Sequence, residues 1–232
     1  MDLMDGLAST RAIRRYRPDP IPEEDLARIL FAASRAPSGS NRQGFRFLVL
    51  RDGERAQQAR ALLAEGARAM WQAKRQTDGY DAGTGASDTS PKARMAATME
   101  HFTEHFHEAP VIVLAALWCH RPPDLELGGA VWPAVQNLLL AARALGYGGV
   151  ITGWHGPRLA ELRAVLAMPE DPLLQLVATI PLGTPVGGHG PVRRRPLGEV
   201  VYEDGWEQSA PWAIDPAGTR FTSAGPPVKT RR

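Results

Sequence analysis

The sequence is poor in cysteine: Cys119 is the only one in 232 residues, so no internal disulfide can form. This usage is typical of proteins kept in a reducing compartment, and we expect a cytoplasmic protein. Cys119 ends an apolar run over residues 111–119, VIVLAALWC. We therefore interpret it as a small buried hydrophobic residue in preference to a nucleophile.

Long hydrophobic runs and an excess of one charge are also missing. The run over residues 111–119 is too short to cross a bilayer. The first ten residues, MDLMDGLAST, contain acids and lack the apolar core of a signal peptide. The 27 Lys and Arg residues are scattered and nearly balanced by 25 Asp and Glu residues. We expect no membrane insertion and no nucleic-acid partner.

The motifs of several common site types are absent. The sequence has no Walker-type glycine loop, no G-x-G-x-x-G after a strand and no G-x-S-x-G elbow. His101 and His105 have the spacing of a helical zinc pair, but no HExxH order accompanies them. We interpret the pair as part of a solvated helix face and expect no metal.

Apolar periodicity predicts alternating helices and strands. The expected helices are residues 2–9, 22–35, 55–74, 94–107, 129–145 and 157–166. The expected strands are residues 45–50, 111–119, 150–154 and 173–182, with a further short strand possible at 197–202. Helix 129–145 is apolar nearly all round, which indicates a central helix or a subunit interface. Pro181 is expected near the end of its strand, where a missing N–H is tolerated.

We expect one domain over residues 1–202, with a lid or insertion at about 66–107, followed by an irregular extension over 203–232. Within the insertion, residues 77–90 (TDGYDAGTGASDTS) are polar and rich in glycine. A substrate lid and an insertion without a role explain this composition equally well.

The stretch Ala32 to Val49 leaves a helix, forms a polar loop and enters a strand. Pro37 disfavours the helical conformation for Ala36, and the SGSN sequence that follows offers turn chemistry. Loops held between rigid elements often carry binding residues, although an ordinary connection would have the same composition.

Arginines cluster near both ends of the chain. They are Arg11, Arg14 and Arg15, then Arg193, Arg194 and Arg195. Guanidinium forks suit phosphate groups. Between the clusters lie the loop that contains Ser38, Asn41 and Gln43 and the turn at residues 152–154. A phosphate-bearing aromatic cofactor would use all four features, whereas each feature alone also fits a surface, a turn or a cap.

The segments TRAIRRY, APSGSNRQGFRFLVL, EAPVIVL, VQNLLLAARALGYGG and VRRRPLGEVV, in this order, resemble the nitroreductase family of FMN flavoproteins. The resemblance extends from Leu7 to Tyr202. The segment GWHGPRLAELRAVLAMPED, with the following RRRPL, is similar to the iodotyrosine deiodinase and flavin-destructase branch. The resemblance implies an α+β fold with a central, mainly antiparallel sheet wrapped by helices. It also implies an interlocked homodimer with FMN at the subunit interface.

The resemblance assigns a set of cofactor-binding residues. They are Arg11, Arg14, Ser38, Asn41, Gln43, Thr152, Gly153, Trp154 and Arg194. It places Arg11 and Arg194 at the FMN phosphate and Arg14 at the flavin N1–C2 carbonyl edge. The loop at residues 38–43 meets the cofactor, and the turn at 152–154 presents its backbone to the ring.

The chain also departs from the family pattern. Thr10 and Ala12 replace an arginine and a serine of the first motif, and Val192 stands where many members have lysine. Gly44 and Phe45 replace the usual Pro-Trp, which should alter packing beside the loop. Thr103 lies where the substrate-binding lysine of the deiodinases is expected.

The function that the resemblance implies is that of an FMN-dependent oxidoreductase. NADH or NADPH would be the reductant and a small aromatic compound, nitro or quinone-like, the acceptor. No catalytic acid or base is required, and Arg14 would tune the flavin. Two alternatives stay open: a reductive dehalogenase or flavin-destructase-type enzyme on the same fold, and a non-catalytic flavin-binding protein.

Overall fold

The computed structural model describes residues 1–87 and 89–222, which form two compact units. The first unit holds Met1 and residues 12–188, and the second holds residues 2–11 and those from 189 onward. The expected single domain over 1–202 stays a prediction. Within the described ranges, no helix has the length and apolar character needed to cross a membrane.

A four-stranded antiparallel sheet forms the centre of the first unit. Its strands lie in the order β1 (Phe45–Leu50), β2 (Val111–Trp118), β4 (Leu174–Gly183) and β3 (Gly148–Gly149). The boundaries of β1, β2 and β4 agree with the sequence predictions to within one residue. The expected α+β fold with a mainly antiparallel sheet is confirmed.

The predicted strand over residues 150–154 is wrong. The chain pairs earlier, at Gly148 and Gly149, and afterwards only Thr152 forms an isolated bridge, to Thr179. The reason is steric: a Cβ on Gly149 would lie 2.6 Å from the Leu182 side chain and 2.8 Å from the Pro181 carbonyl oxygen. Only glycine permits this approach to β4.

A β-bulge changes which face of the sheet β4 presents. Ala115 pairs with Ala178, but Ala116 pairs with Leu176, so Val177 is the extra residue. Leu176 therefore packs on one face of the sheet, while Ala178 packs on the other. A single extra residue inverts the inside–outside alternation of a strand.

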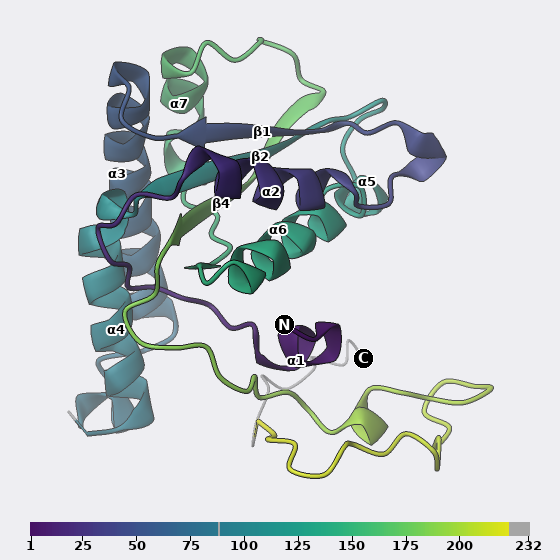
Figure 1. Cartoon of the computed structure of the whole chain (residues 1–232). Coiled ribbons are helices and arrows are strands. Elements are labelled where there is room, and N and C mark those ends of the chain that lie inside the picture. Colours follow the sequence, from purple (N-terminus) through teal and green to yellow (C-terminus); the bar gives the residue numbers. More distant parts are fainter. Residues whose placement is uncertain (88, 223–232) are drawn as a thin grey trace. The chain divides into compact units, whose positions relative to one another are not determined.

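Helices cover both faces of the sheet (Figure 1). One face packs against α2 (Glu23–Ser34) and α6 (Trp132–Ala144), and the short α5 (Leu125–Gly128) precedes α6. The other face packs against α3 (Glu54–Thr77), α4 (Pro91–His105) and α7 (Leu159–Val165). Helix α6 begins three residues later than the predicted start at residue 129, with Pro133 in its first turn.

The face beneath α3 is closed by large apolar residues and by one arginine. Leu63, Phe102 and Phe106 are almost fully buried, and each stabilises the fold by about 1.5–3 kcal/mol. Arg60 is also buried, and its guanidinium donates to backbone carbonyl oxygens. The acceptors are those of Leu50, Arg51, His107, Ala109 and Pro110, at distances from 2.6 to 3.1 Å. This arginine joins α3 to the ends of β1 and β2.

In the second unit, residues 2–11 contact the chain that follows residue 189. Helix α1 (Leu3–Ser9) is capped by the Asp2 carboxylate, and the amide of Val192 donates to the Ala8 carbonyl oxygen at 3.0 Å. The short strand considered at residues 197–202 is wrong: Leu197–Glu199 form a 3-10 turn. From 203 to 222 the chain has only isolated bridges, and the irregular extension over 203–232 stays a prediction. The rest of that extension lies outside the described residues.

Candidate functional site

A pocket of about 350 Å³ lies where the chain after residue 12 runs past the end of α4. Arg14, Tyr16, His101, His105 and Glu108 line it. Two backbone hydrogen bonds fix the chain here: Ile13 donates to Gly149 at 3.0 Å, and Arg17 donates to Thr184 at 2.8 Å. The motif that the sequence singled out is thereby held against β3 and the end of β4.

The Arg14 guanidinium is partly withdrawn from water without an acid to balance it. Burial lowers the pKa of Arg14, while the phenols of Tyr16 and Tyr80 oppose that shift. Among the residues described, Arg14 has no carboxylate within ion-pair distance. Glu108 lies in the same pocket, but it pairs with His105 Nδ1 at 3.0 Å. A half-buried cation of this kind favours an anionic or electron-rich ligand.

The two histidines on α4 differ in exposure, which their i,i+4 spacing could not predict. The rings of His101 and His105 lie 4.4 Å apart. His105 is exposed, as expected for a solvated face, but His101 is half-buried and faces the pocket. Burial and then the nearby Arg15 and His105 lower the pKa of His101. Over residues 1–87 and 89–222, no group of three or more potential ligands is placed to hold a metal ion.

Tyr80 belongs to the glycine-rich segment and is anchored to the neighbouring helices. Its ring lies 5.1 Å from that of Trp71, and the Trp71 indole donates to Glu100 on α4 at 2.7 Å. Arg75 pairs with Asp81 at 2.9 Å. These contacts place a phenol from this segment near Arg14. A lid role for the segment stays a prediction, and Asp88 lies outside the described residues.

The turn at residues 152–154 offers backbone, not side chains. Thr152 and Thr179 exchange backbone hydrogen bonds of 2.9 Å. The Trp154 ring is buried between Phe102 and Phe106, with ring centroids 4.6 and 4.7 Å away. Gly153 is exposed, and a Cβ there would meet nothing closer than the Met70 side chain at 3.8 Å. The backbone at Gly153 is therefore accessible, and its role toward a cofactor stays a prediction.

The loop at residues 38–43 is stabilised by its own polar groups. The Ser38 hydroxyl accepts from the Gln43 amide at 2.8 Å, and the Gln43 side chain donates to Asn41 Oδ1 at 2.9 Å. Ser40, Asn41 and Gln43 have positive φ angles of 51°, 52° and 49°. Such conformations are unfavourable for residues other than glycine and cluster at ligand sites.

Gly44 seats this loop on the end of β2. Its carbonyl oxygen accepts from the Trp118 amide at 2.8 Å, and a Cβ on Gly44 would lie 2.5 Å from the Trp118 carbonyl oxygen. A larger residue would displace one backbone from the other. The glycine that the sequence comparison found unusual therefore has a steric reason.

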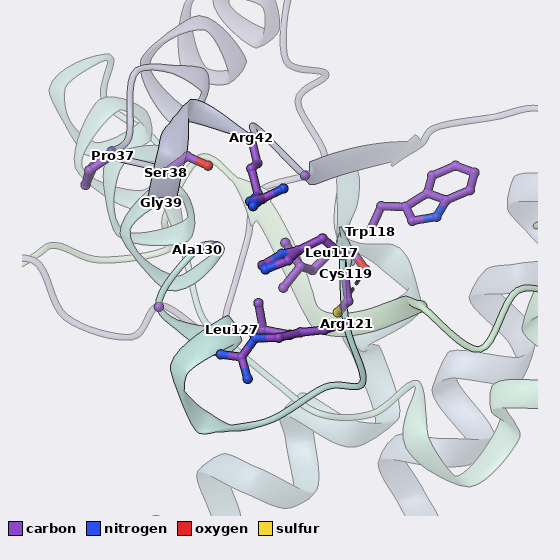
Figure 2. A pocket seen from close by; sticks show the side chains of 13 residues that line it. Pro37, Ser38, Gly39, Arg42, Leu117, Trp118, Cys119, Arg121, Leu127 and Ala130 are labelled. Carbon is purple, nitrogen blue, oxygen red and sulfur yellow. Dashed lines mark hydrogen bonds between the residues drawn. The ribbon is translucent and has the colours of Figure 1, made fainter.

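A second pocket, of about 490 Å³, lies beside this loop (Figure 2). Ser38 and Arg42 line it from the loop, and Leu117, Cys119 and Arg121 line it from β2 and the residues after it. The Arg42 side chain points from the loop toward Leu117. Motif reasoning missed Arg42 and Arg121, since neither belongs to a recognised pattern.

Within the first unit, the 38–43 loop and Arg14 are not brought together. The loop at 38–43 adjoins Trp118 at one end of β2, whereas Tyr16 pairs with Pro185 near the Val111 end. From residue 111 to residue 118, seven steps of about 3.3 Å separate these ends by roughly 23 Å. That is longer than a flavin ring system. Arg11 and Arg194 are exposed and belong to the second unit, where Arg194 donates to the Arg193 carbonyl oxygen at 2.8 Å.

The Nitroreductase family matches residues 7–184 of the chain. The chain belongs to the nitroreductase family. This confirms the resemblance and the expectation of an enzyme of that family.

Curated relatives span different activities. A 5,6-dimethylbenzimidazole synthase from Rhodospirillum rubrum is 32% identical over 155 residues, which make up 62% of this chain and 64% of that protein. The match thus covers less than two thirds of that relative. An iodotyrosine deiodinase from Thermotoga neapolitana is 27% identical over 207 residues, or 87% of this chain and 97% of that protein.

Solved structures show the same nitroreductase fold. A nitroreductase from Desulfovibrio desulfuricans in complex with FMN is 30% identical, with a TM-score of 0.62. The match covers 89% of this chain and 98% of that one. An iodotyrosine deiodinase bound to FMN and 3-iodo-L-tyrosine is 25% identical, with a TM-score of 0.61 over 88% of this chain and 100% of that one.

Two further departures from the family patterns are explained by local contacts. Thr103, which stands at the expected position of the deiodinase lysine, is buried, and its hydroxyl donates to the Glu100 carbonyl oxygen at 2.9 Å. It therefore cannot hold a substrate in a pocket. Thr10 has a local role too, since its hydroxyl donates to Gly6 at 2.6 Å and so closes α1.

Proposed function

We propose that the chain is an FMN-dependent oxidoreductase that oxidises NADH or NADPH and reduces a small aromatic acceptor. The observation that carries this proposal is Arg14, a half-buried guanidinium that faces a pocket and lacks a carboxylate partner among the described residues. FMN, when bound, supplies the redox chemistry. Arg14 would hold its N1–C2 edge and stabilise the negative charge that reduction places there.

The remaining residues of the first unit fit a supporting role. The Gly153 backbone is exposed and has space in front of it. Trp154 fixes the turn by packing its ring into the core. The chain would thus orient the cofactor and keep one face of it dry. No side chain needs to act as a proton donor for this function.

The separation of the 38–43 loop from Arg14 supports a homodimer. In such a dimer each cofactor site would take Arg14 and the 152–154 turn from one copy and the loop from the other. Large apolar side chains on α2 and α6 are available for this contact: Phe31 is 64% exposed and Trp132 is 42% exposed. Burial of such side chains drives association.

A second candidate is a reductive dehalogenase or a flavin-consuming enzyme on the same fold. It is favoured by the two curated relatives, a deiodinase and a 5,6-dimethylbenzimidazole synthase. The buried Thr103 argues against a substrate site of the deiodinase type. Product analysis after aerobic incubation with reduced FMN, and after incubation with a halogenated phenol, separates these reactions from acceptor reduction.

The proposal is tested by purifying the full chain and recording its visible spectrum with and without added FMN. We expect flavin absorption that stays with the protein through gel filtration. Anaerobic NADH or NADPH should bleach it, and a nitroaromatic or quinone should restore it. A protein that takes up no FMN contradicts the proposal. Flavin that is bound but is not bleached by either nucleotide indicates a non-catalytic flavin-binding protein.

Arg194 tests the contribution of the second unit. We expect Arg194→Ala to weaken FMN retention by about tenfold, because a guanidinium–phosphate contact is lost. Equilibrium dialysis of FMN against the variant measures this. The matched control is Arg28→Ala, which removes an exposed arginine that pairs with Asp25 on α2. Equal FMN affinity in both variants would remove Arg194 from the site.

A further inference from the structure

His101 faces the Arg14 pocket from the side of α4. The walls of this pocket also hold Arg15, from the chain after residue 12, and His105 and Glu108, from α4 and the turn that follows it. Histidine is the side chain whose charge changes between about pH 5 and pH 8. The two histidines therefore give the pocket a charge that depends on pH, whereas Arg14 contributes a constant one.

Of the two histidines, only His101 lacks an acidic partner in the described chain. His105 is exposed, and its Nδ1 pairs with Glu108 at 3.0 Å. His101 is half-buried with its ring 4.4 Å from that of His105, and over residues 1–87 and 89–222 it forms no ion pair with a carboxylate. Its imidazole is therefore available to interact with a molecule in the pocket.

The backbone of His101 is held by the residues that also hold the 152–154 turn. Phe102, the next residue along α4, is almost fully buried, and so is Phe106. Their ring centroids lie 4.6 and 4.7 Å from that of Trp154, whose side chain anchors the turn. One aromatic cluster therefore fixes the α4 side of the pocket relative to the turn that the cofactor is proposed to face.

The charged and titratable groups around His101 come from three segments. They are Arg14, Arg15 and Tyr16 from the chain after residue 12, Tyr80 beside Arg14, and Glu104, His105 and Glu108 from α4 and the following turn. Burial, and then Arg15 and His105, lower the pKa of His101, while the two glutamates oppose this shift. Without a ligand the ring is mainly neutral at pH 7, and a negative charge placed in the pocket would favour its protonation.

We propose that His101 tunes the reduction potential of the bound flavin: when protonated, it adds a second positive charge to that of Arg14 and makes reduction easier. The inference rests on the proposed function, in which reduction places a negative charge at the flavin edge that Arg14 holds. The imidazole takes its proton from solvent and acts through its charge alone, so no bond to the flavin forms or breaks. By linkage, the free energy by which protonation favours reduction equals that by which reduction favours protonation.

The first test measures the pKa of His101 in the full-length protein with FMN bound, by NMR of the imidazole ring. The titration is made with oxidised FMN and again after anaerobic reduction by dithionite, which requires neither NADH nor NADPH. We expect reduction to raise the proton affinity of His101 by about tenfold, as a nearby opposite charge does. His107 is exposed and does not line the pocket, so it is the internal control and should titrate alike in both states.

The second test compares reduction potentials from about pH 5 to pH 8. His101→Gln removes the charge, so its potential should match that of the wild type well above the pKa of His101 and fall increasingly below it as the pH decreases. His101→Lys carries a fixed charge and should keep a raised potential over the whole range. His107→Gln should follow the wild type. A purely structural role would shift the potential by the same amount at every pH, so the pH dependence of the difference identifies the charge.

Three results would overturn the proposal. They are a His101 pKa that is the same in both redox states, a difference between wild type and His101→Gln that is independent of pH, and equal potentials in His101→Lys and His101→Gln. The NMR titration needs no variant, so it decides the proposal even where a substitution prevents folding.

The same measurements separate this proposal from the proposed function. A chain that takes up no FMN overturns both. If NADH or NADPH bleaches the flavin but the pKa of His101 does not respond to reduction, the tuning role alone fails. If that pKa responds to dithionite but neither nucleotide bleaches the flavin, the proposed reductase activity fails and the tuning role stands.

Discussion

The face of the sheet beneath α3 and the pockets at the two ends of β2 use arginine in different ways. Arg60, beneath α3, donates to five backbone carbonyl oxygens. Arg14 and Arg42 each face a pocket and, in the ranges that the structure describes, have no carboxylate partner. The comparison shows that pairing, more than burial, distinguishes an arginine that holds the fold from one available to a ligand.

The largest effect is expected for Arg60→Leu. Removing the guanidinium leaves buried carbonyl oxygens without donors, and hydrogen bonds to charged groups contribute about 1.5–3 kcal/mol each. We expect a loss of about 3–5 kcal/mol in the free energy of unfolding, measured by urea denaturation. Arg55→Leu, on the exposed side of the same helix, is the control and should change stability by less than about 0.5 kcal/mol. A loss below 1 kcal/mol for Arg60→Leu would contradict a structural role.

A smaller effect is expected at the loop end of the sheet. The Cβ of Gly44→Ala would lie 2.5 Å from the Trp118 carbonyl oxygen, so two backbones must separate. We expect a loss of about 1–3 kcal/mol, again from urea denaturation. Gly39→Ala is the matched control from the same loop, because nothing lies within 4 Å of its added Cβ. Equal stability of both variants would show that the loop is not seated on β2 as described.

Arg14→Gln should separate binding from stability. Because Arg14 has no acid partner in the described chain, we expect the free energy of unfolding without FMN to change by less than about 0.5 kcal/mol. FMN affinity should fall by about tenfold, since a charged contact is lost. Fluorescence titration of FMN measures the second quantity, and Arg17→Gln is the control from the same segment. A loss of stability like that of Arg60→Leu would remove the distinction between the two arginines.

Local patterns predicted much of the fold. Strand β1 has the predicted boundaries, because FRFLVL is apolar and is entered from a turn. The wrong predictions, the strands at 150–154 and 197–202, lie where contacts with residues distant in sequence determine the local structure. The pairing of Gly148 and Gly149 depends on the space left by Leu182, and Leu197 turns because its amide donates to the Asp215 carboxylate at 3.0 Å. Neither contact has a signal within the short segment that it changes.

The residues of the candidate site also divide into those that local motifs predicted and those that only the packing of the fold brings close. Arg14 and the 152–154 turn could be found because they belong to motifs. Tyr80 and His101 could not, since their proximity to Arg14 follows from how α3 and α4 pack. The sequence also could not show that the 38–43 loop and Arg14 lie at opposite ends of β2. That separation follows from antiparallel pairing and from the direction in which the chain enters β1.

The smallest effect is a pH dependence that tests how fully the face beneath α3 is satisfied. His155 is buried with Nδ1 3.1 Å from the Thr179 hydroxyl, and burial lowers its pKa below 6.5, opposed by a backbone hydrogen bond at Leu176. The folded state therefore keeps the ring neutral, whereas the unfolded state gains a proton below pH 6.5. The stability that His155 contributes is complete above that pH and decreases as the pH falls below it, by less than about 1.4 kcal/mol per pH unit.

We expect His155→Gln to flatten the dependence of the free energy of unfolding on pH between pH 6.5 and about pH 5. His107→Gln, at an exposed position, is the control and should leave that dependence unchanged. An unchanged slope in His155→Gln, from urea denaturation at several pH values, would mean that the His155 ring takes up its proton in the folded state as readily as in the unfolded state, and that burial does not keep it neutral.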